Sequence, residues 1–300
     1  MQRRLPLFCL LFATALPLFA QETAASTKKL RVHVIGASVS GGFRDGPLFG
    51  AKEQGDSVTL QQVVKAWAGD SARVTTHSTT QMTGMFTDPI GIGTEEVQQA
   101  LRSKPDIVLA IDFPFWFAYG YVSGDEAKAR KEKLAEGLAM LAKFEVPVLL
   151  GDLPDMHGAA RRMLNPRQIP SKKVLAELNE QLTAFCKQHT NMHLTPLSKL
   201  VSTMRDEGVV LPLASGALKT GPGALQQEDR LHATRLGMAY LGYVLQEPMR
   251  ELFPKDHALH ARDWKFEQFV EAAGADGDLE QAEAAAKNAK AGEKPAVVGK

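Results

Sequence analysis

The sequence predicts a three-layer α/β fold, in which helices cover both faces of a mostly parallel sheet. Stretches with the composition of strands alternate along the chain with amphipathic stretches of helical length. Two strand-like stretches, I-V-L-A-I after Asp106 and V-P-V-L-L ending at Leu150, are aliphatic without polar alternation, as expected of strands buried on both faces. The 300 residues, 44% of them hydrophobic, suffice for one large domain with a core.

The first 20 residues have the features of a bacterial signal peptide. Arg3 and Arg4 form a positive start, Leu5 to Ala15 form an apolar core, and Ala20 is a small residue at the expected cleavage position. The apolar stretch is short and interrupted by proline, which argues against a membrane span in the mature chain. We expect a secreted or periplasmic protein with a polar linker over residues 21–29; an uncleaved anchor is the alternative.

Four elements are expected in the first third of the domain. β-Branched residues from Val32 lead directly into Gly36, which predicts a buried strand that stops at a turn. In the last of the four, Thr94 would cap a helix whose Val97 and Leu101 face inward. The elements are a strand over 30–35, a helix over 58–68, a strand over 72–77 and a helix over 94–102.

The same alternation continues to the end of the domain. The elements expected are a strand over 107–112, a helix over 123–144, a strand over 146–150, a helix over 171–188, a strand over 192–195, a loop over 209–223 and a helix over 229–252. From about Ala272 the chain is rich in Ala, Lys, Glu and Gly and has no aromatic residue. This composition predicts a domain over residues 30–271 and a tail over 272–300 that is disordered or a frayed helix.

Charge and cysteine content exclude several classes of protein. The formal net charge of +1 argues against a nucleic-acid partner or a polybasic membrane surface. Cys9 would leave with the signal peptide, so Cys186 is the one thiol of the mature chain; it lies in an amphipathic helix pattern typical of a small core residue. The sequence has no G-x-G-x-x-G motif, and His189 and His193 straddle a helix end and a strand, so we expect no cofactor and no metal.

Two separated motifs contain the parts of an acyl-transfer triad. Ser38 follows the end of the first predicted strand, where ligands bind in open α/β sheets. Near the end of the chain, D-R-L-H places Asp229 and His232 three residues apart at a loop-to-helix junction. Ser38 would attack, His232 would take its proton, and Asp229 would hold the imidazole tautomer. The alternative is that Ser38 caps a helix and His232 is an ordinary surface histidine.

These motifs resemble the outer sequence blocks of the SGNH or GDSL hydrolase superfamily. V-I-G-A-S-V-S resembles the family's serine block, and D-R-L-H-A-T-R-L-G resembles its D-x-x-H block. The resemblance spans roughly Leu30 to Leu252. It implies a flavodoxin-like sheet and hydrolysis of an ester, either a small molecule or a group attached to a polymer.

The chain departs from the family pattern at the residues that would bind the oxyanion. The family's Asp before the serine is Ala37 here, and the chain has A-I-D-F-P-F-W where a G-x-N-D block is expected, so the usual Asn is missing. Gly84 and Gln81 are candidate oxyanion donors, and Asp112 and Trp116 are candidates for substrate contact. Either other donors complete the oxyanion hole or the protein is a weak or altered catalyst.

Two further functions are open, the first of them because of the missing Asn. One is a non-catalytic exported protein of the same fold that binds a carbohydrate or another envelope component. The other is a flavodoxin-like small-molecule binder unrelated to hydrolases. A distance between Ser38 and His232 greater than a hydrogen bond plus one water would favour this small-molecule binder.

Overall fold

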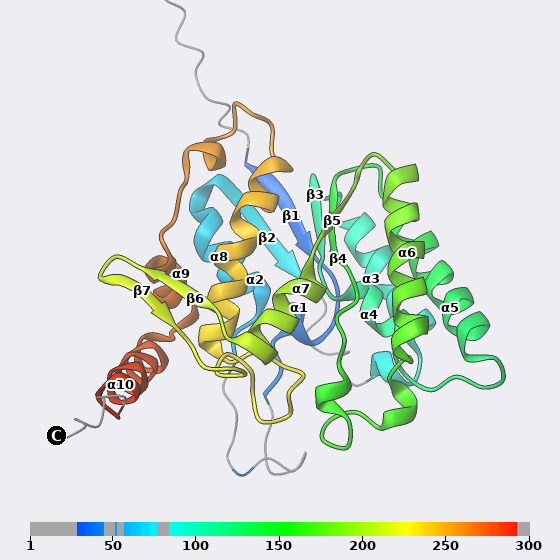
Figure 1. The fold of residues 1–300 in the computed structure, drawn as a ribbon. Coiled ribbons are helices and arrows are strands. Elements are labelled where there is room, and N and C mark those ends of the chain that lie inside the picture. The colour runs from blue at the N-terminus through cyan, green and yellow to red at the C-terminus, as the bar shows by residue number, and fades with distance from the viewer. Residues whose placement is uncertain (1–28, 45–51, 53–56, 77–83, 293–300) are drawn as a thin grey trace, which may run out of the picture.

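The computed structural model describes residues 29–44, 52, 57–76 and 84–292 (Figure 1). The predicted signal peptide, most of the predicted linker and Gln81 lie outside the described residues. Within the described ranges, no helix is long and apolar enough to cross a membrane.

Five parallel strands form the central sheet in the order β2-β1-β3-β4-β5, and this confirms the predicted α/β fold with a mostly parallel sheet (Figure 1). The strands are β1 (Leu30–Val34), β2 (Ala72–Thr76), β3 (Ile107–Ala110), β4 (Val148–Gly151) and β5 (Met192–Thr195). In this doubly wound order the chain turns toward opposite edges of the sheet after β1 and after β3. Ligands bind beyond the carboxyl ends of the strands at such a switch point. Ser38 and Asp112 follow these two strands.

Helices cover both faces of the sheet and divide the core into two clusters. In β3, Ile107 and Leu109 pack into the cluster on the side of α2, α8 and α9, whereas Val108 and Ala110 pack into the cluster on the side of α3 to α6. This explains why the strand is aliphatic at every position. The helices are α1 (Ser38–Gly41), α2 (Leu60–Ala68), α3 (Pro89–Arg102), α4 (Phe113–Ala118), α5 (Glu126–Leu141), α6 (Lys172–Gln188), α7 (Leu197–Ser202), α8 (Arg235–Glu251), α9 (Phe266–Ala273) and α10 (Asp276–Gly292).

Helix α3 differs from its prediction at both its start and its buried face. It begins at Pro89, and Asp88 caps it by accepting a hydrogen bond from Gly91 N at 2.8 Å. The predicted cap at Thr94 is therefore wrong, because two early glycines hide the first turns of the helix from a propensity argument. The buried face consists of Gly93, Glu96, Val97 and Ala100, so the prediction that Leu101 points inward is also wrong.

Several segments differ from the prediction or decide between its alternatives. Residues predicted as a loop form the antiparallel hairpin of β6 (Val210–Leu213) and β7 (Gly216–Lys219). The aromatic run after β3 forms the short helix α4. The segment from Asp276 to Gly292, for which disorder and a frayed helix were both open, is helix α10, and an ion pair joins its Asp278 to Arg235 at 3.3 Å.

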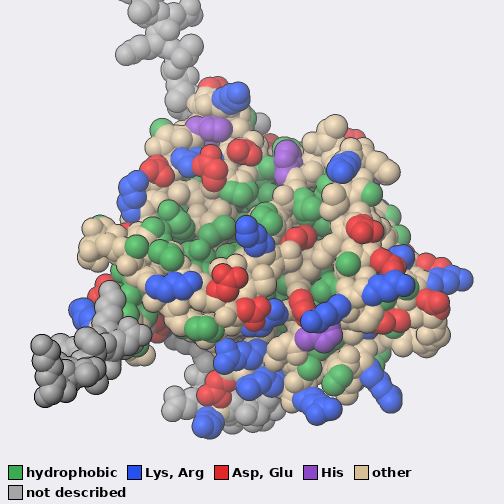
Figure 2. Space-filling model, in the orientation of Figure 1, with side chains coloured by type: hydrophobic (Ala, Val, Ile, Leu, Met, Phe, Trp, Pro, Cys, Tyr) green, Lys and Arg blue, Asp and Glu red, His purple; other side chains and the backbone are tan. Residues whose placement is uncertain are grey.

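Acidic and basic side chains are interspersed over the face of the molecule seen in Figure 2. Neither sign dominates this face as a whole, in keeping with the formal net charge of +1.

Candidate active site

The turn after β1 is built closely around the carboxylate of Asp112. Gly36 adopts φ 134°, a conformation that favours glycine. A Cβ atom at this position would collide with Asp112 Oδ1 and would lie 2.7 Å from Ser40 Oγ. The chain then enters helix α1 at Ser38, whose side chain is half-buried. Only glycine lets the chain pass so close to another side chain before the serine.

Asp112 holds this turn with both of its carboxylate oxygens. Oδ1 accepts hydrogen bonds from Ala37 N at 3.2 Å and from Ser40 Oγ at 2.7 Å, and Oδ2 accepts from Val39 N at 2.7 Å and from Ser40 N at 3.4 Å. Burial raises the pKa of the Asp112 carboxyl, while these hydrogen bonds act in the opposite direction. A carboxylate is therefore present at the serine turn although residue 37 is Ala, and it comes from β3.

The hydrogen bonds of the turn leave the Ser38 N–H free. Gly36 N donates to Glu96 Oε2 at 2.9 Å, and the N–H groups of Ala37, Val39 and Ser40 donate to Asp112. Within the described part of the chain, no acceptor binds the Ser38 N–H. The one unused donor of this turn therefore belongs to the candidate nucleophile itself, which is where an oxyanion hole needs a donor.

Glu96 supports the turn from α3 as a buried acid. Its side chain is 3% exposed, and burial raises its pKa to about 8. The free carboxyl ionises near 4.5, so between about pH 4.5 and pH 8 the folded state holds one more proton than the unfolded state. The free energy of unfolding therefore falls as the pH rises through this window, by up to about 5 kcal/mol in total.

Urea unfolding near pH 5 and near pH 8 checks this dependence. We expect Glu96→Gln to lose a large part of the decrease that the wild type shows, because the amide cannot ionise. Glu95→Gln is the matched control, since Glu95 is the exposed neighbour on the same helix. The assignment is wrong if Glu96→Gln and Glu95→Gln show the same change with pH.

Asp229 and His232 form a buried pair in the loop before α8. His232 Nδ1 lies 2.5 Å from Asp229 Oδ2, and the two side chains are 7% and 2% exposed. Asp229 Oδ1 accepts from the backbone N–H groups of Leu231 at 2.8 Å and His232 at 3.0 Å. Burial alone would raise the pKa of Asp229, but these hydrogen bonds together lower it. An ionised Asp229 fixes the proton on Nδ1 and leaves Nε2 as the basic nitrogen.

Aromatic stacking and a bridging glutamine join this pair to the loop of Ser38. The ring of Phe43, five residues after Ser38, stacks on His232 with a centroid distance of 4.1 Å. Gln227 Nε2 donates to Phe43 O and to Ala233 O, both at 2.8 Å. Among the described residues, no hydrogen bond joins Ser38 Oγ to His232 directly. Catalytic hydrogen bonds are often long before substrate binds.

Ser38 lines an apolar cavity of about 60 Å³ beyond the carboxyl ends of β3 and β4. Leu231 and Ala233, the two neighbours of His232, line the same cavity. Other walls come from α4, α7, the turn Thr203–Glu207 that follows α7, and α8; they include Phe115, Leu197, Met204, Met238 and Leu241. The cavity gives a small apolar group a place next to the serine hydroxyl.

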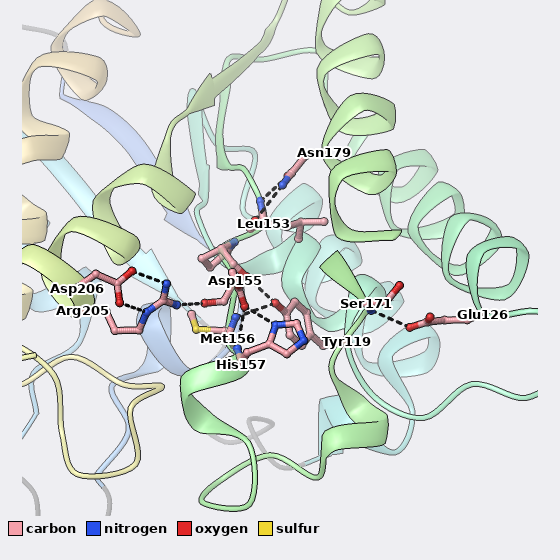
Figure 3. A network of polar contacts seen from close by, with 11 residues as sticks. Tyr119, Glu126, Leu153, Asp155, Met156, His157, Ser171, Asn179, Arg205 and Asp206 are labelled. Carbon is pink, nitrogen blue, oxygen red and sulfur yellow. Dashed lines mark hydrogen bonds and ion pairs between the residues drawn. The ribbon is translucent and has the colours of Figure 1, made fainter. Parts of the chain in front are cut away.

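A polar network holds the cavity wall formed by the loop after β4 (Figure 3). The Tyr119 hydroxyl donates to Pro154 O at 2.5 Å and accepts from Met156 N at 3.3 Å. Arg205 donates to the carbonyl oxygen of Asp155 from the opposite side. Because Pro154 and Met156 both line the cavity, these bonds fix its shape.

The same loop contains a second Asp–His pair, Asp155 and His157. His157 Nδ1 lies 2.5 Å from Asp155 Oδ1, but the His157 side chain is 42% exposed (Figure 3). Among the described residues, no hydrogen bond or ring contact joins this pair to the serine turn. His232 contacts the loop of Ser38 through the ring of Phe43 and is therefore the better candidate base.

The other predicted site residues lie at different depths. Trp116 is 4% exposed and packs edge-on against Phe86 at a centroid distance of 4.2 Å, so it belongs to the core next to the cavity, whose aromatic wall is Phe115. Gly84 begins the short 3₁₀ turn that carries Phe86.

Cys186 is half-buried on α6, and burial raises its pKa to about 11. Within the described ranges, no cluster of His, Cys, Asp or Glu could hold a metal ion.

Sequence reasoning did not identify Glu96, Gln226 or Gln227 as site residues. Glu96 carried one weak signal, since it is a carboxylate directly before Val97, a position expected to face inward. The two glutamines carried none, because their roles depend on the loop that brings residues 226 and 233 together.

Comparisons with known proteins give low similarities. No family model matches the chain, and no curated protein matches it in sequence. An acetyl xylan esterase structure superposes with a TM-score of 0.44 at 16% identity, covering 73% of this chain and 99% of that one. A GDSL-like lipase from Bacteroides thetaiotaomicron superposes with a TM-score of 0.42 at 11% identity, covering 74% and 89%. A gut microbial diltiazem-metabolizing enzyme gives a TM-score of 0.45 at 10% identity; the match covers 74% of this chain and 47% of that protein. Because these TM-scores are low, the function proposed next rests on the geometry of the site itself.

Proposed function

We propose that the protein is a serine hydrolase that cleaves a carboxylic ester through Ser38, His232 and Asp229. The observation that carries the proposal is the buried Asp229–His232 pair, 2.5 Å between Oδ2 and Nδ1, which the ring of Phe43 joins to the loop of Ser38, a serine whose own N–H is unused among the described residues. The apolar cavity beside Ser38 supports an acyl substituent rather than a charged one.

The proposed reaction follows from the free atoms of the site. Ser38 Oγ attacks the ester carbonyl carbon, His232 Nε2 takes the hydroxyl proton, and the Ser38 N–H donates to the developing oxyanion. The protonated imidazole, held by Asp229, gives its proton to the leaving alcohol and an acyl-serine remains. Water then attacks the acyl group by the same steps in reverse, which releases the acid and restores Ser38.

Labelling of the wild-type protein tests this proposal. A fluorophosphonate probe should react with one serine, and mass spectrometry of the digested protein should place the label on the peptide that contains Ser38. The wild type should also hydrolyse p-nitrophenyl acetate. A protein that is neither labelled nor active would favour the second candidate, a non-catalytic binding protein, which the absence of Asn at position 112 supports.

We also propose that the substrate is met outside the cytoplasm, because the first 20 residues have the features of a signal peptide. The ester is then a small molecule or a group on an extracellular or periplasmic polymer.

A further inference from the structure

Among the described residues, no group donates a hydrogen bond to one buried acceptor of the cavity beside Ser38. Gln226 is 9% exposed and lines the cavity. Its Oε1 atom is buried and has no hydrogen-bond partner within the described part of the structure. Buried polar atoms without partners are costly and rare, so a bound molecule that donates a hydrogen bond there would be favoured.

Both carboxylates that line the cavity already accept hydrogen bonds from the protein. Asp152 accepts from Ser198 N at 2.5 Å and from Ser198 Oγ at 2.6 Å. Asp112 is used entirely by the serine turn. Gln226 Oε1 is the buried side-chain acceptor of the cavity lining for which the described residues provide no donor.

The loop backbone explains why Gln226 and Gln227 have different roles. Gln226 pairs with Ala233 in an antiparallel bridge, an extended conformation in which successive side chains point to opposite sides. The side chain of Gln227 bonds to Phe43 O, on the nucleophile loop. The side chain of Gln226 therefore turns the other way, into the cavity.

The size of the cavity limits the ligand. About 60 Å³ is available, and one water needs roughly 10–15 Å³ on this measure, so the space suits on the order of four to six non-hydrogen atoms. The side chains of the walls are apolar, apart from those of Ser38, Asp112, Asp152 and Gln226. An acyl chain of about four carbons with one hydroxyl group satisfies both the volume and the free acceptor.

We propose that this cavity binds the acyl part of the substrate and that Gln226 selects short hydroxyacyl groups, whose hydroxyl donates to Oε1. The placement of the acyl group next to Ser38 rests on the proposed function. The recognition of the hydroxyl group is a binding property that can be measured without turnover.

Binding of three neutral amides of equal chain length provides the first test. Titration monitored by ligand NMR should show that the wild type binds 3-hydroxybutyramide about 10- to 100-fold more tightly than butyramide. Acetoacetamide, which offers only an acceptor at the same carbon, should bind no better than butyramide. In Gln226→Leu the ratio of the affinity for 3-hydroxybutyramide to that for butyramide should fall to about 1.

Gln181→Leu is the matched control variant. Gln181 also has a buried Oε1 without a partner, but it lies on α6 and does not line this cavity. It should keep the wild-type preference. Equal affinities of the wild type for the hydroxylated and plain amides would overturn the inference. So would tight binding of acetoacetamide, or an equal loss of preference in Gln181→Leu.

The corresponding p-nitrophenyl esters extend the test to catalysis. The ratio of kcat/KM for 3-hydroxybutyrate over butyrate should be about 10 to 100 in the wild type and about 1 in Gln226→Leu. If no ester is cleaved but the amides show the expected preference, the proposed function fails and the assignment of the cavity stands. If esters are cleaved without preference and the amides bind equally, the assignment fails and the proposed function stands.

Discussion

Replacing Ser38 by Ala is expected to lower kcat for p-nitrophenyl acetate by about 10⁴- to 10⁶-fold and to abolish labelling by a fluorophosphonate. The hydroxyl is the atom that forms the covalent bond, so no neighbouring group can substitute for it. The fold should be unaffected, because Ser38 Oγ makes no hydrogen bond among the described residues and the side chain is half-buried. Stopped assays at high enzyme concentration measure the remaining rate.

Two controls make this result specific. Ser71→Ala removes a hydroxyl at the start of β2, at the opposite end of the strands, and should keep full activity. Urea unfolding of Ser38→Ala should match that of the wild type within about 0.5 kcal/mol. Labelling that persists in Ser38→Ala would rule out this serine as the nucleophile and with it the proposed triad.

The positions of Ser38, Asp229 and His232 were accessible to sequence reasoning because each depends on local structure. Ser38 follows a strand whose β-branched residues end at Gly36. Asp229 and His232 are three residues apart, so a single turn brings their side chains together. Neither inference required knowledge of how distant segments pack.

The support of the serine turn depends on the order of the strands, which the pattern of residues does not reveal. Asp112 reaches Ala37, Val39 and Ser40 because β1 and β3 are adjacent in the sheet, although 75 residues separate Ala37 from Asp112. The sequence suggested a functional carboxylate at the end of β3. It did not indicate that this carboxylate holds backbone N–H groups.

The missed elements have equally physical explanations. Gly91 and Gly93 weaken the helical signal of α3, yet Gly93 is required there because a Cβ atom would lie 2.7 Å from Phe117 Cζ. The hairpin of β6 and β7 carries Pro212 and Gly216, residues that sequence patterns associate with loops. In both places tertiary contacts outweigh local propensity.

Replacing Asp112 by Ala is expected to lower the free energy of unfolding by about 3–5 kcal/mol, because three backbone N–H groups of the serine turn would remain buried without an acceptor. The turn would then relax, and a displacement of Ser38 by about 1 Å is enough to reduce kcat by about 10²-fold. Asp70 provides a matched control, because its fully exposed side chain makes, among the described residues, a single long contact with Lys29 at 3.5 Å. Asp70→Ala should change neither stability nor activity measurably.

Asp112→Asn separates a positioning role from a direct role in binding the oxyanion. An amide has one oxygen, so its nitrogen would face either the N–H of Ala37 or those of Val39 and Ser40, and part of the stability should be lost. If Asp112 acts only by positioning the turn, Asn should lower kcat together with stability, to a smaller extent than Ala does. Higher turnover in Asp112→Asn than in the wild type would instead mean that this side chain reaches the oxyanion, where the related family pattern has its Asn. In that case the carboxylate of Asp112 keeps the site weakly active, and the positioning role is wrong.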